Sequence, residues 1–209
     1  MLAIAGGKGG CGKTTTALGL ARGLAELGAS PLVVDADLDM PDLHHRAAVD
    51  RSPGIAAASD RQRPAEAAQS AGRLPGVDVL PCCDATTATA ASLFDRLQAH
   101  PDPVLLDCPA GAGPDAVAPL RAADRTVVVS TPRERSLRDA AKTAAMARQL
   151  DAPPALVVLV RSDGAVNPEP LFDCQHVVHI PELSEPPLET EESAARHLHC
   201  AKILSKRNV

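Results

Sequence analysis

A glycine-rich segment near the start of the chain constrains the fold more than any other feature. Residues 7–14 read Gly-Lys-Gly-Gly-Cys-Gly-Lys-Thr, which satisfies the G-x-x-x-x-G-K-[ST] phosphate-binding pattern. The segment follows an apolar run, residues 2–5, and opens a stretch with helical spacing, residues 14–27, which Gly28 closes. Glycines let successive backbone N–H groups turn inward, and a helix N-terminus adds partial positive charge. Residues 7–15 are therefore predicted to bind the phosphates of a nucleotide.

Apolar runs alternate with helical stretches along the chain, as expected for a parallel sheet covered by helices on both faces. The expected strands are residues 2–5, 32–35, 77–80, 104–106, 126–129, 156–160 and 177–180. Helices are expected over 14–27, 136–150 and 190–206, whereas residues 40–76 are weakly periodic and suit either short helices or a loop. Pro and Gly clusters, including 109–114, are expected between elements.

The length of 209 residues suits a single core. We therefore expect one α/β domain over residues 1–209. Its architecture should be a three-layer sandwich with a mostly parallel sheet of seven or eight strands and the P-loop NTPase fold.

A dinucleotide-binding loop is the main rival interpretation. Gly7, Gly9 and Gly12 also match G-x-G-x-x-G, and Asp35 stands at a suitable distance to hold a ribose. The pair Lys13-Thr14 has no task in such a loop, however. A second acidic strand end, Val104-Leu105-Leu106-Asp107, is also what a nucleotide–Mg²⁺ site requires. These two features favour the P-loop interpretation.

Composition limits the partners. Phe94 and Phe172 are the only aromatic residues, so the chain offers no stacking platform for single-stranded nucleic acid. The net charge of −5 gives no general attraction to nucleic acid or anionic lipid. No signal peptide and no apolar stretch approaching 18 residues is recognisable. We therefore expect a cytoplasmic protein for which nucleic acid is not a partner.

Several segments resemble the MinD/ParA family of deviant Walker A ATPases, and its MinD-like branch in particular. The likeness covers nearly the whole chain in order and spacing. Residues 8–15 resemble the deviant Walker A loop, whose mark is the extra lysine, here Lys8. The other matching segments are Asp35-Ala36-Asp37 (switch I), Asp107-Cys108-Pro109-Ala110-Gly111 (switch II), residues 127–132 with 136–140, and Ile180-Pro181-Glu182.

The resemblance implies a role for each matching residue. Lys13 would bridge the β- and γ-phosphates, and Thr14, Asp35 and Asp107 would hold Mg²⁺ directly or through water, because Mg²⁺ prefers hard oxygen ligands. Asp37 would position the attacking water, and Lys8 would act on the phosphates of a second subunit. The remaining expected nucleotide contacts are Gly9, Gly10, Cys11, Gly12 and Thr15 in the loop, Gly111 at the γ-phosphate, and Arg161 and Pro181 near the base.

The chain departs from the family where adenine is read. The family carries an Asn just after its sixth strand, but here residues 159–162 are Leu-Val-Arg-Ser, and the next Asn is Asn167. Either backbone groups near Pro181-Glu182 or stacking by Arg161 could replace it. Base specificity is open at this level.

The resemblance implies a Mg²⁺-dependent ATP hydrolase that acts as an ATP-driven homodimerisation switch, with a protein partner that stimulates hydrolysis, in the spatial organisation of the cell. Two alternatives are a metal-cluster or cofactor-assembly ATPase and a non-hydrolysing nucleotide-bound scaffold. His44-His45 and Cys82-Cys83 invite a metal site, although adjacent side chains point apart and lack ligand spacing.

The last expected helix ends near three cations, Lys202, Lys206 and Arg207. A core-packed helix is expected, because only Asn208 and Val209 follow and cations suit the helix C-terminus. Peripheral membrane contact through this helix is the alternative.

Overall fold

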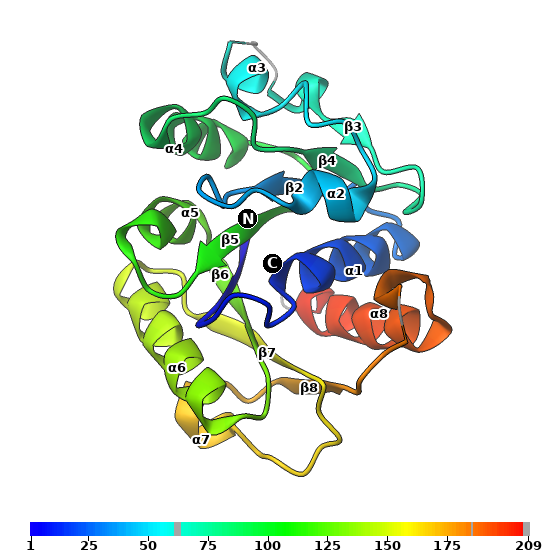
Figure 1. Ribbon diagram of the computed structural model, residues 1–209, viewed down its shortest axis with the longest axis vertical. Helices are drawn as coiled ribbons and strands as arrows, with labels where there is room; N and C mark the ends of the chain where they lie inside the picture. Colours follow the sequence, from blue (N-terminus) through cyan, green and yellow to red (C-terminus); the bar gives the residue numbers. More distant parts are fainter. Residues whose placement is uncertain (61–63, 185, 207–209) are drawn as a thin grey trace.

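The computed structural model describes residues 1–60, 64–184 and 186–206. Within these ranges eight strands form one sheet in the order β3-β4-β2-β5-β1-β6-β7-β8, and Figure 1 shows helices on both sides of it. Neighbouring strands run parallel, apart from the antiparallel pair β3–β4. The strands are Leu2–Gly6 (β1), Leu32–Asp35 (β2), Gln69–Ser70 (β3), Asp78–Leu80 (β4), Val104–Ala110 (β5), Arg125–Ser130 (β6), Pro154–Val160 (β7) and Val177–Ile180 (β8). The predicted α/β sandwich is confirmed.

The seven expected strands are all present, and the structure adds β3. Its two residues pair only with Val79 and Asp78, which is too short a segment to produce a periodic pattern. β5 is longer than expected and takes in Pro109, which was expected in a turn. A register irregularity between Ile4 and Gly6 of β1 lies opposite this part of β5. Proline is tolerated in a strand at such irregularities, because it cannot donate to a regular ladder.

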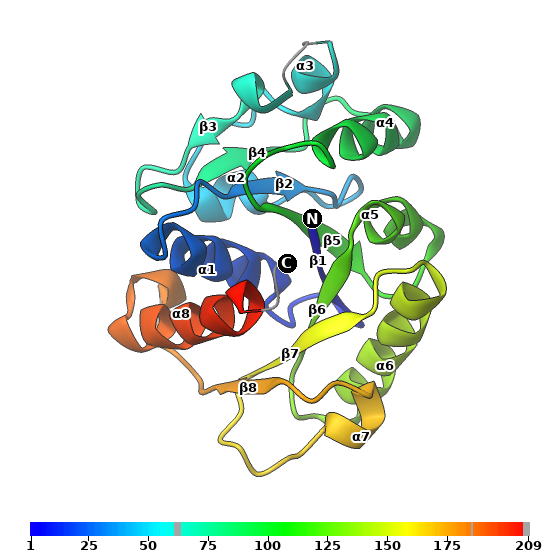
Figure 2. The same cartoon turned by 180° about the vertical axis from the view of Figure 1, so that it is seen from behind.

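One face of the sheet is covered by three helices: Lys13–Glu26 (α1), Leu43–Ala47 (α2) and Glu191–Ser205 (α8). The other face is covered by the helices Ile55–Ser59 (α3), Thr87–Leu97 (α4), Val117–Ala122 (α5), Glu134–Gln149 (α6) and Glu169–Phe172 (α7), as the two opposite views show (Figures 1 and 2). A hydrophobic core lies on each face of the sheet, and successive residues of β1 point to opposite faces. Leu2 and Ile4 pack on the α1 side, whereas Ala3 and Ala5 pack on the α4 side.

The three expected helices are present, and the described residues form five more. Of these, α2 and α3 lie where short helices were one of two expectations, whereas α4, α5 and α7 were not predicted. The longest of these is α4, whose N-cap residue Thr86 accepts a hydrogen bond from the Thr89 N–H at 3.1 Å. Its buried residues Leu93, Phe94 and Leu97 have helical spacing, so a capping signal was present in the sequence. α2 and α3 lie in the weakly periodic region 40–76, where each is only five residues long.

α8 packs lengthwise against α1 (Figures 1 and 2). Cys200, Ala201 and Leu204 are buried in this contact, as expected for a core-packed helix. Lys202 and Lys206 are exposed, and Arg207 lies outside the described residues. No helix in the described part of the chain is both long and apolar enough to span a membrane.

Candidate functional site

A cleft of about 390 Å³ opens at the carboxyl ends of the central strands, around the first turn of α1. Ligands of open parallel sheets bind at this edge, because the loops that follow the strands converge there. Residues from both ends of the chain meet in it. Its walls include Gly9, Gly10, Gly12, Lys13, Thr14, Thr15, Thr16, Asp37, Met40, Asp42, Arg46, Asp107, Cys108, Ala110, Val160, Arg161, Ile180, Pro181, Glu182, Leu183, Pro187 and His197.

The loop between β1 and α1 has the backbone conformation that its glycines allow. Gly10 and Gly12 have φ angles of 72° and 93°, a region that L side chains rarely adopt. A Cβ added at Gly9 or Gly10 would meet nothing within 4 Å, so the backbone is open to a ligand there. The Cys11 side chain turns inward instead, where Sγ donates to the Val129 carbonyl at 3.6 Å. Any contact of Cys11 with a ligand is therefore left to its backbone.

α1 begins at Lys13, directly beyond Gly12, whose carbonyl accepts the Thr16 N–H at 2.9 Å. Lys13, Thr14 and Thr15 therefore lie in the first turn, and all three line the cleft. The unpaired N–H groups and partial positive charge of this turn favour an anion.

Two buried aspartates stand side by side behind this turn. Asp35 and Asp107 are direct neighbours in the β2–β5 register, and their exposed fractions are 1% and 2%. Burial raises the pKa of Asp35 to about 8, and the Asp107 charge raises it further. Burial likewise raises the pKa of Asp107 to about 7, against the opposing effects of the Thr14 hydroxyl and of Lys13. No cation among the described residues therefore offsets the burial of Asp35, and Lys13 offsets that of Asp107 only in part.

The two aspartates differ in their free oxygen atoms. Asp35 accepts N–H groups from Asp37 at 3.2 Å and from Leu43 at 3.3 Å, one on each oxygen, and it is not among the described residues that line the cleft. Asp107 lines the cleft, and its Oδ1 has no hydrogen-bond partner within the described ranges. The structure thus brings Thr14 and Asp107 together at the cleft, with Asp35 behind them.

The two other residues predicted to be catalytic lie further out. Asp37 lines the cleft, and its Oδ1 accepts the Met40 N–H at 3.1 Å, which closes the loop after β2. Lys8 is exposed and stands outside the set of described residues that line the cleft. Its side chain is therefore available to a second molecule.

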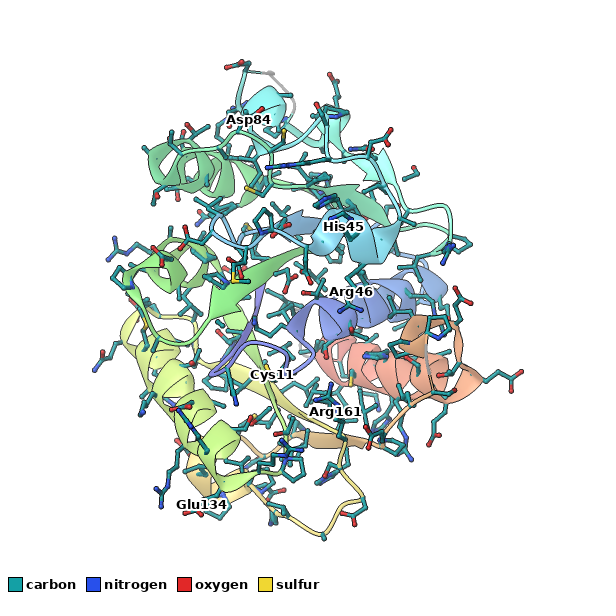
Figure 3. All side chains as sticks on the ribbon, viewed as in Figure 1. Cys11, His45, Arg46, Asp84, Glu134 and Arg161 are labelled. Atoms are coloured by element: carbon teal, nitrogen blue, oxygen red, sulfur yellow. The ribbon has the colours of Figure 1, made fainter. Side chains whose placement is uncertain are left out.

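The predicted base contacts lie at the other end of the cleft, beside β7 and β8. Arg161 adopts a left-handed conformation with φ 53°, and its Nη1 donates to the Gly10 carbonyl at 3.4 Å. Figure 3 shows Arg161 and Cys11 on the same side of the N-terminal part of α1, with Arg46 further toward α2. Pro181 and Glu182 line the cleft beside Arg161. Both replacements considered for the missing Asn thus line the same cleft, and their contact with a base stays a prediction.

Gly111 differs from its expected placement. Its N–H donates to the Gly6 carbonyl at 2.9 Å, and Ala110 rather than Gly111 belongs to the cleft lining among the described residues. A contact between the Gly111 N–H and a phosphate requires this bond to be exchanged, so that role stays a prediction.

Asp42, Arg46 and His197 are among the cleft residues that had no predicted role in the site. Asp42 accepts a hydrogen bond from the Thr14 hydroxyl at 3.2 Å, and Arg46 lies 3.8 Å from Asp42 through its Nε. The placement of Asp42 just before a helix is a signal that sequence reasoning could have used. His197 comes from α8, far along the chain, and only tertiary packing brings it here.

Among the described residues, the paired histidines and cysteines do not belong to a group of three or more side chains that could hold a metal ion. The rings of His44 and His45 stack with centroids 3.9 Å apart, and Cys82 is buried while Cys83 is half-buried. Over the described ranges, no three His, Cys, Asp or Glu side chains are grouped as a metal-binding set of this kind.

The chain is similar in sequence to several known nucleotide-binding proteins. The family model for the CobQ/CobB/MinD/ParA nucleotide binding domain matches residues 2–173. The septum site-determining protein MinD of Synechocystis sp. is 34% identical over 152 residues, which are 67% of this chain and 56% of that protein. An iron-sulfur cluster carrier protein of Methanococcus maripaludis is 29% identical over 191 residues, 86% of this chain and 64% of that protein.

A solved structure shares the fold over almost the whole length. The septum site-determining protein MinD of Pyrococcus horikoshii OT3, complexed with Mg-ADP, matches with a TM-score of 0.85 at 24% identity, covering 99% of this chain and 96% of that one. The alignment with the Synechocystis relative, in contrast, spans little more than half of that protein.

Proposed function

The chain belongs to the CobQ/CobB/MinD/ParA nucleotide-binding family, and from this premise we propose that it is a Mg²⁺-dependent ATPase that works as an ATP-driven dimerisation switch. One observation carries the proposal. The Thr14 hydroxyl and the unpartnered Oδ1 of Asp107 belong to one cleft at the N-terminus of α1. A nucleotide with its metal ion needs this combination of a phosphate cradle and hard oxygen ligands.

The residues present fit Mg²⁺. A buried carboxylate oxygen without a partner is costly, and a cation removes that cost. Thr14 would hold Mg²⁺ through its hydroxyl, and Asp107 and Asp35 would hold waters of its shell. When bound, Mg²⁺ neutralises phosphate charge and orients the terminal phosphate. ATP with Mg²⁺ as the ligand pair is further supported by the MinD relative that was solved with Mg-ADP.

The side chains of the cleft divide the remaining work. The backbone from Gly9 to Gly12 and the first turn of α1 bind the phosphates. Lys13 places its cation against the β- and γ-phosphates. Asp37 orients the attacking water from the loop after β2, because its second carboxylate oxygen is not used by the bond to Met40.

Dimerisation is proposed for the exposed side of the loop. Lys8 is exposed and is not among the described residues that line the cleft of its own subunit, so the phosphates of a facing subunit are its proposed target. A cation supplied in trans stabilises the charge of a phosphoryl-transfer transition state. Hydrolysis would then separate the subunits, and a protein partner that reads and stimulates this cycle completes the switch. A role in cell division is supported by the septum site-determining MinD relatives, and partitioning or positioning of a complex is proposed beside it.

A metal-cluster or cofactor-assembly ATPase is the second candidate function. The observation in its favour is the iron-sulfur cluster carrier relative, which aligns with 86% of this chain. Iron and sulfide analysis of anaerobically purified and reconstituted protein separates the two: bound cluster supports the assembly role, and no cluster under both conditions supports the switch. A scaffold that binds ATP without hydrolysis is a third possibility, and it predicts no phosphate release.

The proposed activity is tested by phosphate release with ATP, with and without Mg²⁺. Hydrolysis should vanish in EDTA, and Asp107→Ala should weaken Mg²⁺-dependent nucleotide binding. Lys13→Ala should abolish turnover and weaken ATP binding, whereas Lys142→Ala, an exposed lysine on α6, is the matched control. Full turnover in EDTA or in Asp107→Ala would overturn the metal assignment.

A further inference from the structure

A buried imidazole belongs to the cleft that is proposed to hold the nucleotide. His197 belongs to α8, only 2% of its surface is exposed, and it nevertheless forms part of the cleft wall. None of the roles assigned above to phosphate, metal or water uses this residue.

The ring has one polar atom in use and one free. Nδ1 lies 2.8 Å from the Ser193 carbonyl and 3.1 Å from the Ser193 hydroxyl. A carbonyl only accepts, so Nδ1 carries the hydrogen. Nε2 is buried and has no hydrogen-bond partner among the described residues. Burial lowers the pKa of His197 to about 4, so the ring is neutral at neutral pH and Nε2 is an acceptor with an unused lone pair.

The fold makes room for this ring at a specific place. Gly19 and Gly23 lie one turn apart inside α1, where glycine is unfavourable for a helix. A Cβ at Gly19 would lie 2.5 Å from His197 Nδ1, and one at Gly23 would lie 2.8 Å from the His197 carbonyl oxygen. α1 therefore carries two glycines where α8 brings in the imidazole.

Apolar residues of the same cleft suit a flat base. Val160, Ile180, Leu183 and Pro187 also line the cleft, and their apolar surfaces can cover the faces of a purine. A ribose, with its hydroxyl groups, is a poorer match for such a lining. The family's Asn that reads adenine is also missing here. It was expected directly after β7, the sixth of the strands predicted from the sequence, but Arg161 and Ser162 stand there.

We propose that His197 is a specificity-determining residue for adenine, whose 6-amino group donates a hydrogen bond to Nε2. Guanine and hypoxanthine present a carbonyl oxygen at this position, and two acceptors repel each other. The site therefore selects the purine that carries an amine at carbon 6. This inference rests on the proposed nucleotide-binding function and adds the means of base selection to it.

The first test varies only the ligand, so it does not depend on any variant folding. Calorimetric titration of the wild-type chain with Mg²⁺ compares ADP, IDP and purine ribonucleoside diphosphate, which has hydrogen at carbon 6. Diphosphates avoid hydrolysis during the titration. ADP should bind about tenfold more tightly than the unsubstituted purine, as one well-placed hydrogen bond allows, and IDP should bind no more tightly than the latter. Equal affinity for all three would overturn the proposal.

The second test removes the acceptor. His197→Phe keeps a flat ring without a lone pair, and its preference for ADP over the unsubstituted purine should fall to within about twofold. His199→Gln, an exposed histidine of the same helix, is the control and should keep the preference of the parent. A melting curve checks that each variant is folded.

Three results would contradict the assignment. Retained preference in folded His197→Phe, or an equal loss of affinity for both ligands, would reduce His197 to a packing role. If the parent bound 2′-deoxyADP more weakly than ADP and His197→Phe did not, the hydrogen-bond donor to Nε2 would be the ribose 2′-hydroxyl and not the base. If the wild-type chain binds none of the diphosphates, the proposed nucleotide-binding function itself fails, which is distinct from binding without base discrimination.

Discussion

The Thr14 hydroxyl donates a hydrogen bond to Asp42 Oδ1 at 3.2 Å, and this contact joins the first turn of α1 to the residue that precedes α2. Asp42 is in turn 3.8 Å from Arg46, through its other oxygen. The hydroxyl proposed to hold Mg²⁺ thus already donates to a carboxylate other than Asp35 and Asp107. Asp42 adds negative charge at the proposed metal site, since it raises the pKa of Asp107, although less strongly than burial does.

Asp42→Asn should therefore weaken Mg²⁺ binding while it leaves room for a bond to Thr14. Removing one partly exposed charge near the metal is expected to raise the Mg²⁺ concentration for half-maximal nucleotide binding about threefold to tenfold. Titration of Mg²⁺ at fixed ADP measures the change. Nucleotide binding in EDTA should match that of the parent, and an unchanged Mg²⁺ requirement would show that Asp42 does not contribute to the metal site.

Asp35 should make the nucleotide-free protein less stable as the pH rises. Its pKa is about 8 in the folded chain and 3.8 ordinarily, so between these values the folded state holds a proton that the unfolded state has released. The free energy of unfolding must then fall as the pH rises from about 4 to about 8. Asp35→Asn removes this titration, so its free energy of unfolding should change much less between pH 5 and pH 8 than that of the parent, and Mg²⁺-dependent turnover should be lost. The amide also gives up one of the two N–H bonds that the carboxylate oxygens accept, so the pH slope and not the absolute stability is the measure.

Urea unfolding in EDTA at pH 5 and pH 8 measures this slope. The control is Asp39→Asn, an exposed aspartate of the same loop, which should leave the pH dependence as in the parent. If the parent and Asp35→Asn showed the same change in stability between pH 5 and pH 8, the raised pKa of Asp35 would not be the source of the slope.

Substitutions of Lys8 and Asp37 should block the proposed cycle at different steps. Lys8→Ala should keep nucleotide binding, because its side chain lies outside the cleft, but lose both dimerisation and turnover. Asp37→Ala should bind ATP and dimerise, then stay dimeric, because the water is no longer oriented. Light scattering with ATP, recorded alongside phosphate release, follows both variants. A Lys8→Ala variant that dimerises and hydrolyses ATP like the parent would leave only the general P-loop assignment.

Replacement of Cys82 and Cys83 by Ala should leave ATP turnover and metal content unchanged. Burial raises the pKa of Cys82 to about 11, so its thiol stays protonated at neutral pH and is a poor metal ligand. Loss of the buried sulfur should cost about 1 kcal/mol of stability. Metal analysis and thermal melting check both parts, and loss of bound iron or zinc in the variant would favour the assembly ATPase.

The sequence by itself determined the features that are local or periodic. The loop from Gly7 to Thr15 is a continuous segment, and the φ angles of Gly10 and Gly12 show why glycine is needed there. The strands were predictable because apolar runs buried on both faces stand out from their neighbours. Even the meeting of Asp35 and Asp107 follows from two parallel strands ending at one sheet edge.

Tertiary structure decided everything that depends on packing between distant segments. β3 exists only through its partner strand β4, and the five-residue helices α2 and α3 are too short to be stable alone. The contact of Asp42 with Thr14 depends on how the loop after β2 folds back onto α1. His197 reaches the cleft because Gly19 and Gly23 let α8 approach α1 closely. No local pattern encodes such an approach, since its energy comes from two surfaces that meet only in the folded chain.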